Sequence, residues 1–88
     1  MIGAWDEILR HGRPVRELRD VAPGDVVFLE NGDASLMVAY MVGGVVRCDG
    51  LTHLYVAGLT GRKYTLGGAS TMRFRGARRQ LAMREADS

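Results

Sequence analysis

The residues of this chain best suited to contact a partner are arginines in one short segment, residues 71–75. Its strict alternation predicts a strand with Met72 and Phe74 on one face and Arg73 and Arg75 on the other. The two guanidinium groups would then lie about 7 Å apart along the strand, close to the phosphate spacing of an extended nucleic-acid strand. The segment therefore indicates binding to an anionic backbone.

Neighbouring basic residues extend this candidate site. If the strand that holds Arg62 and Lys63 pairs with residues 70–75 through the Gly67-Gly68 turn, all of these charges form one patch. The alternative is a charged outer face whose arginines pair with acids from the first half of the chain. The predicted binding residues are Arg62, Lys63, Arg73, Arg75, Arg78 and Arg79.

The charges divide the chain into two halves of opposite sign. Residues 1–50 hold eight acidic residues and five arginines, whereas the stretch between Asp49 and Glu85 holds seven basic residues and no acid. The net charge of +2 hides this asymmetry. Such a distribution favours an anionic partner for the second half, either nucleic acid or an acidic protein surface.

Residue types that could support catalysis or metal binding are few. Cys48 and His53 flank an Asp49-Gly50 turn, so a hairpin would place His53 opposite Val46 rather than opposite Cys48. We therefore expect a buried cysteine and a strand histidine instead of a nucleophile and its base. Together with His11 these residues show no known metal-ligand spacing, and the chain has no Walker A loop and no Gly-x-Ser-x-Gly. We expect neither an enzyme nor a cofactor.

Four aromatic residues could interleave with the candidate site, although only Tyr64 and Phe74 lie near it in sequence. Such side chains could stack on bases, but ordinary core packing is the favoured interpretation. They are Tyr40, Tyr55, Tyr64 and Phe74.

Two segments precede the strands. Residues 4–11 read as a short helix with Trp5, Ile8 and Leu9 on one face, which either caps the open end of a barrel or binds a partner. Pro14–Val21 forms either a further helical turn or an extended lead-in strand.

From Pro23 onward, short apolar runs alternate with turn residues. This spacing predicts five or six short antiparallel strands between residues 25 and 75, as a small SH3-like barrel or a β-sandwich. Ala77–Arg84 then forms a short C-terminal helix or a frayed tail. The expected strands are Asp25–Glu30, Ser35–Val42, Val45–Cys48, Leu51–Ala57, Arg62–Leu66 and Ser70–Arg75, with turns at 31–33, 43–44, 49–50, 58–61 and 67–68.

The apolar faces of these elements predict the core. Its expected members are Trp5, Leu9, Val26, Phe28, Leu36, Val38, Val46, Leu54, Val56, Met72 and Phe74.

One stretch resembles a known module. Pro23-Gly24-Asp25-Val26-Val27, followed by Asn31-Gly32 and Met37-Val38, is similar to the opening of small SH3-like β-barrels and to the short, uncharacterised YodC-like bacterial proteins. The resemblance covers residues 23–50, and the chain departs from the YodC-like pattern after Gly50. It implies a barrel and carries no function, since such folds serve many functions.

Length and composition set the remaining expectations. The 88 residues indicate one domain over residues 1–84, followed by a disordered tail at 85–88. A single cysteine and no apolar run of membrane-spanning length predict a cytoplasmic protein without membrane contact. Ser35–Val42 is apolar on both faces, which favours a homodimer. The arginine-, glycine- and alanine-rich composition is typical of a bacterial or phage gene.

Two functions of different kinds remain open. The first is a non-enzymatic module that binds nucleic-acid backbone through its basic strand face. The second is a phage or mobile-element protein that inhibits or adapts a host complex, or a small phage structural protein.

Overall fold

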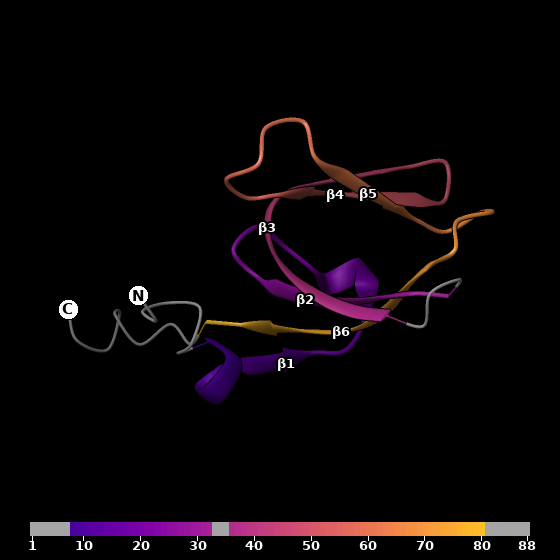
Figure 1. The fold of residues 1–88 in the computed structure, drawn as a ribbon. Coiled ribbons are helices and arrows are strands. Elements are labelled where there is room, and N and C mark those ends of the chain that lie inside the picture. Colours follow the sequence, from indigo (N-terminus) through magenta and orange to yellow (C-terminus); the bar gives the residue numbers. More distant parts are fainter. Residues whose placement is uncertain (1–7, 33–35, 81–88) are drawn as a thin grey trace.

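The computed structural model describes residues 8–32 and 36–80, and these form one antiparallel sheet of six strands (Figure 1). Neighbouring strands follow the order β1-β6-β2-β3-β4-β5, so the C-terminal strand lies between β1 and β2. The mainly β prediction is confirmed. The strands are β1 (Arg13–Val15), β2 (Val26–Asn31), β3 (Leu36–Cys48), β4 (Leu51–Val56), β5 (Lys63–Leu66) and β6 (Met72–Arg79).

The long strand β3 bends the sheet into two layers. Its first half pairs with β2 and its second half with β4, so it curves from the layer of β1, β6 and β2 to the layer of β4 and β5 (Figure 1). The sheet stays open, because β5 pairs with β4 and not with β6 among the described residues.

A bulge at Gly43 replaces the predicted turn at Gly43-Gly44. Val42 pairs with Val56 and Gly44 with Tyr55, so Gly43 is one extra residue in a continuous strand. The extra residue reverses the facing of the second half of β3. Two expected strands, Ser35–Val42 and Val45–Cys48, are therefore one.

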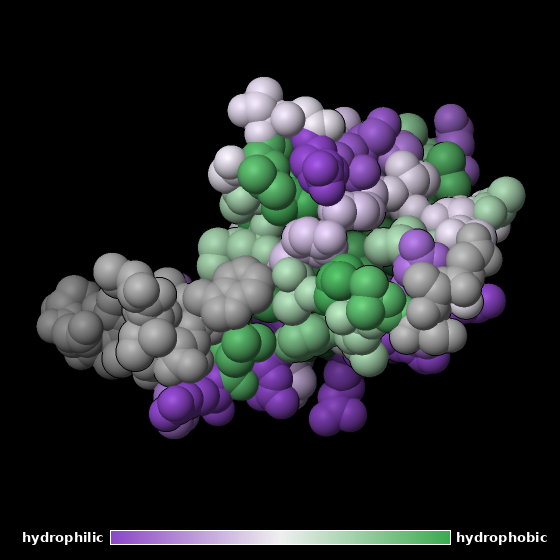
Figure 2. Space-filling view, viewed as in Figure 1, coloured by the Kyte–Doolittle hydropathy of each residue, from purple (hydrophilic) through white to green (hydrophobic). Residues whose placement is uncertain are grey.

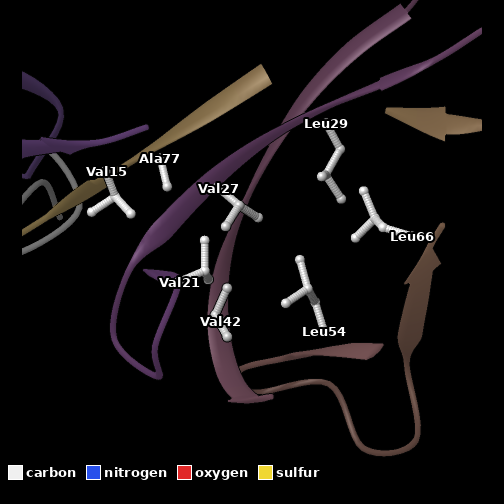
Figure 3. Packing of buried hydrophobic residues seen from close by; sticks show 8 residues of the cluster. All are labelled: Val15, Val21, Val27, Leu29, Val42, Leu54, Leu66 and Ala77. Carbon is white, nitrogen blue, oxygen red and sulfur yellow. The ribbon is translucent and has the colours of Figure 1, made fainter. Parts of the chain in front are cut away.

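The core lies inside the curve of the sheet. Inward positions of every strand meet there, and Val21 joins them from the segment before β2 (Figure 3). Alternation points Val26, which is also fully buried, to the opposite face of β2. The core cluster is Val15, Val21, Val27, Leu29, Val42, Leu54, Leu66 and Ala77.

The core prediction is right for some positions and wrong for others. Val26 and Leu54 are buried, while Leu9, Phe28, Val38, Val56, Met72 and Phe74 are half-buried. Val46 is 48% exposed because the bulge turns Val45 inward instead, and Leu36 is 59% exposed at the start of β3. Trp5 lies outside the described residues.

Both interpretations of residues 14–21 hold in part. Arg13–Val15 is extended and pairs with β6, and Leu18–Asp20 forms a single 3₁₀ turn. Before them, residues 8–11 are helical, with Ile8 buried and its carbonyl accepting a hydrogen bond from the Gly12 N–H. The rest of the predicted helix lies outside the described residues.

The C-terminal helix prediction is wrong where it can be checked. Ala77–Arg79 belong to β6, because β2 and β1 pair with this segment on its two sides and Ala77 is buried between them. Helix propensity here yields to tertiary pairing. Residues 81–88, which include the expected tail at 85–88, lie outside the described residues. No helix among the described residues is long and apolar enough to span a membrane.

Candidate nucleic-acid interface

Strand β6 presents its arginines on the outer face of the sheet. Arg73 and Arg75 are exposed, while Met72 and Phe74 are half-buried and pack against the core. The facing is the one that strict alternation predicts. Arg73 forms no ion pair with any described residue, and its Nε lies near the Gly32 turn.

Arg75 and Arg79 form ion pairs with acids from the first half of the chain. Arg75 donates to Glu30 on β2, where the side chains remain 51% and 25% exposed. Arg79 faces Asp25, whose side chain is only 1% exposed. The alternative interpretation, in which the arginines pair with acids of the first half, is therefore correct for these two residues.

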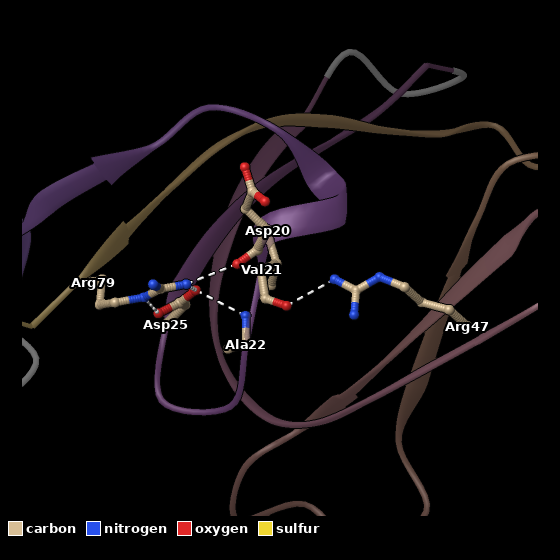
Figure 4. A network of polar contacts seen from close by, with 6 residues as sticks. All are labelled: Asp20, Val21, Ala22, Asp25, Arg47 and Arg79. Carbon is tan, nitrogen blue, oxygen red and sulfur yellow. Dashed lines mark hydrogen bonds and ion pairs between the residues drawn. The ribbon is translucent and has the colours of Figure 1, made fainter.

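Arg79 is held by three acceptors at once (Figure 4). Its Nε and Nη2 donate to the two carboxylate oxygens of Asp25 at 2.9 and 3.0 Å, and Nη2 also donates to the Asp20 carbonyl at 2.7 Å. The hydrogen bonds with Asp25 raise the pKa of Arg79. Asp25 also accepts the Ala22 N–H at 2.9 Å. Arg79 is thus part of the fold, not of a free binding surface.

Arg47 has a similar structural role that the sequence analysis missed. Its Nη2 donates to the Leu18 carbonyl at 3.0 Å and to the Val21 carbonyl at 2.8 Å, the second of which Figure 4 shows. These two hydrogen bonds hold the 3₁₀ turn against the end of β3. Asp25 was missed as well. No sequence signal distinguishes these residues from surface charges, because their partners lie more than 25 residues away, at separations of 26 and 54.

Arg62 and Lys63 lie in the other layer. β5 pairs only with β4 among the described residues, so the expected hairpin with β6 through Gly67-Gly68 is wrong. Loop 67–71 instead carries the chain from one edge of the sheet to a strand between β1 and β2. The six predicted residues therefore do not form one patch.

A groove lies beside β6, where the strand extends beyond the end of β1. Its volume is about 450 Å³, and its lining includes Phe28 from β2 and Gly76, which has a φ of 115°. Arg16, Arg75 and Arg78 also line it, and no acidic residue among the described ones does. Hydrophilic residues gather along the border of the molecule beneath β1 and β6 (Figure 2).

Arg78 gives this groove a positive charge, and Phe28 gives it an aromatic ring. Arg78 donates to the neutral carbonyl of Gly12 at 2.9 Å, so its positive charge is not cancelled there. Phe28 alternates away from buried Val27 and Leu29 and so faces the arginine side of the sheet. The core prediction placed Phe28 inward with Val26, and no sequence signal corrects this, because both faces of β2 are apolar.

A second aromatic arrangement lies inside the curve of the sheet. The rings of Tyr40 and Tyr64 stack with centroids 4.8 Å apart, and their hydroxyl oxygens share a hydrogen bond at 2.8 Å. Arg62 donates to the Tyr64 hydroxyl at 3.1 Å. The hydrogen bond with Tyr40, aided by Arg62, lowers the pKa of Tyr64, and the same hydrogen bond raises the pKa of Tyr40. Both residues, like Phe74, pack against the core, whereas Tyr55 is 38% exposed.

The cysteine and histidine do not form a reactive pair. His53 pairs with Val46 as the hairpin predicts, and its Nδ1 lies 2.8 Å from the Thr65 hydroxyl. Cys48 is exposed, so the expectation of a buried cysteine is wrong. It pairs with Leu51 at the end of β3, next to the Asp49-Gly50 turn. Within residues 8–32 and 36–80, no three side chains of metal-binding type come together.

Comparison of this chain with family models, curated proteins and solved structures finds no match.

Proposed function

We propose that this chain is a non-enzymatic binding module that contacts the backbone of nucleic acid through the outer face of β6. The observation that carries the proposal is the groove with its three arginines and no acid among the described lining residues. Exposed Arg73 continues the same face toward the Gly32 turn. A surface of this charge attracts phosphates without reading bases.

The proposed contact residues are a revised set. Arg73, Arg75 and Arg78 remain, and Arg16 joins them from the segment after β1. Arg79 is left out because its guanidinium group forms an ion pair with Asp25. Arg62 and Lys63 lie in the other layer and serve as a comparison set.

Salt dependence tests the proposal. Anisotropy of labelled oligonucleotides should show binding at low salt, with a logarithmic slope of about −0.7 per phosphate neutralised on a single strand and about −0.9 on a duplex. Replacing Arg73 and Arg75 with Ala should reduce the slope and the affinity. The matched double variant, Arg62→Ala with Lys63→Ala, removes the same charge from the other layer. It should leave the salt slope and the affinity unchanged. Absence of binding to any nucleic acid at low salt would reject the proposal.

The runner-up function is a phage or mobile-element protein that binds a host complex. Exposed large apolar side chains on the surface favour it, because such residues are often protein contacts. These are Leu36, Met37, Val46, Tyr55 and Leu59. A protein partner that survives nuclease treatment and is lost with the Arg73 and Arg75 variant would favour this alternative over nucleic acid.

We also propose a barrel-like architecture and a homodimer. The contacts between β5 and β6 and the bend of the sheet at β3 support an open SH3-like barrel in a single domain. Exposed Met37 beside Leu36 supports a homodimer formed through β3. Sedimentation that shows only monomer at high micromolar concentration would reject the homodimer. A cytoplasmic location also stays a prediction.

A further inference from the structure

We infer that the groove beside Gly76 takes one unstacked base of a single-stranded nucleic acid, with Phe28 as the stacking surface. This inference rests on the proposed function and adds the class of nucleic acid.

The groove exists because β6 carries an irregularity opposite Phe28. Val27 pairs with Ala77 and Leu29 with Phe74, so two residues of β6, Arg75 and Gly76, lie opposite the single residue Phe28. Gly76 contributes no side chain at this point, and a Cβ built on it would meet no atom within 4 Å. The space over Phe28 is therefore left open.

A planar apolar ring in a basic groove favours a base over a bare phosphate. Phe28 is half-buried and lines the groove, while Pro14 of β1 provides a second apolar wall. Every base offers a flat face, so stacking on a phenyl ring works for any sequence. The volume of about 450 Å³ falls in the range of sites for small molecules and leaves room for one base with part of its sugar.

The surrounding arginines would hold the phosphates on either side of that base. Arg75 and Arg78 come from β6, and Arg16 is the residue directly after β1. Glu30 cancels part of the charge of Arg75, so Arg16 and Arg78 have the larger share of the attraction. A duplex keeps its bases paired and stacked, so it can meet the arginines but cannot fill the groove.

The test compares three labelled ligands of equal length at the same low salt: oligothymidylate, its abasic counterpart with the same phosphates, and a duplex. Oligothymidylate should bind about tenfold more tightly than the abasic strand. Phe28→Leu should remove that preference and leave abasic binding unchanged, with a thermal melt that verifies the fold. Tyr55→Leu, which changes an exposed aromatic residue on β4, is the control and should keep the preference.

The outcomes separate this inference from the proposed function. Equal binding of oligothymidylate and the abasic strand, or a preference that survives Phe28→Leu, would overturn the inference and leave backbone binding in place. Absence of binding to all three ligands would reject both.

If Phe28→Leu fails to fold, crosslinking of the wild-type protein tests whether a base stacks on Phe28. A strand that contains 5-bromodeoxyuridine should crosslink at Phe28 under ultraviolet light, as located by mass spectrometry. A crosslink confined to residues outside the groove would contradict the inference.

Discussion

Arg79 and Asp25, 54 residues apart, form a bidentate ion pair that joins the C-terminal strand β6 to the turn before β2. The Asp25 side chain is 1% exposed and that of Arg79 is 34% exposed. A buried carboxylate is tolerated only with such partners. The pair brings Asp20, Ala22 and Asp25 together against β6.

Asp25→Asn should therefore destabilise the protein strongly. It removes the charge that balances Arg79, whose side chain is 34% exposed, and weakens two charge-assisted hydrogen bonds, so it should cost about 1.5–3 kcal/mol. The melting temperature should fall by at least about 6 °C in a domain of this size. Glu30→Gln is the control, because it breaks the exposed pair with Arg75 and should cost less than about 1 kcal/mol. Equal melting temperatures for the two variants would contradict the structural role of Asp25.

The bulge in β3 should tolerate a side chain at one glycine and not at its neighbour. A Cβ at Gly43 would lie 3.0 Å from the Ala57 Cα, whereas at Gly44 the nearest contact is Tyr55 Cβ at 3.8 Å. Gly43→Ala should cost about 1–3 kcal/mol through overpacking, and Gly44→Ala should be neutral or slightly stabilising. Urea unfolding of both variants measures the difference. Comparable stability would mean that the Ala57 backbone yields without cost.

The facing of β3 after the bulge can be checked with one matched pair. Val45→Asp places a charge against the core, where Val45 packs, and should cost about 2–4 kcal/mol. Val46→Asp changes a residue that is 48% exposed and should cost less than about 1 kcal/mol. Thermal melts would show the opposite order if Gly43-Gly44 were a turn and the facing of the second half were reversed.

The tyrosine pair should titrate in two separated steps. An isolated tyrosine has a pKa of about 10. The pKa of Tyr64 is lowered by its hydrogen bonds with Tyr40 and Arg62, so it should ionise below that value, and Tyr40 should ionise above it. Absorbance at alkaline pH, compared between the wild type and Tyr40→Phe, measures this. The variant should move the Tyr64 step upward, because the hydrogen bond that favours the tyrosinate is gone.

The two tyrosines act on stability in opposite directions. The lowered pKa of Tyr64 adds stability above the pKa of the unfolded chain, and that gain is lost as pH falls through the folded pKa. The raised pKa of Tyr40 adds stability below the unfolded pKa, and that gain is lost as pH rises through its own folded value. In the wild type, stability should therefore rise as pH increases from the lowered pKa of Tyr64 toward the unfolded pKa, and fall from there toward the raised pKa of Tyr40. Urea unfolding at a series of alkaline pH values measures both slopes.

Local chemistry explains which parts of the fold could be predicted. The Asp49-Gly50 turn is specified by its own two residues, both with positive φ (54° and 77°), and β2 follows from its apolar run. Gly43-Gly44 is compatible with either a turn or a bulge, and only pairing with β4 decides between them. The facing of Val45 and Val46 depends on that choice.

The candidate site was harder to predict because its charges depend on distant residues. Alternation alone places Arg73 and Arg75 outward. The ion pair of Arg79 and the separation of Arg62 from β6 depend on which strands become neighbours, and a loop such as 67–71 does not encode that. Phe28 was assigned to the core together with Val26, which shares its face of β2, whereas Val27 and Leu29 face the core cluster. Both faces of this strand are apolar, so alternation alone does not decide which of them faces the core.

The continuity of β3 has a consequence for how the molecule unfolds. Since one strand of 13 residues supplies hydrogen bonds to β2 in one layer and β4 in the other, neither layer is complete without it. We expect a single cooperative transition, with the slowest amide hydrogen exchange on β2 and on the half of β3 that pairs with it. A fragment that ends at Val42 would lose Leu54, Leu66 and Ala77 from the core, and should not fold alone.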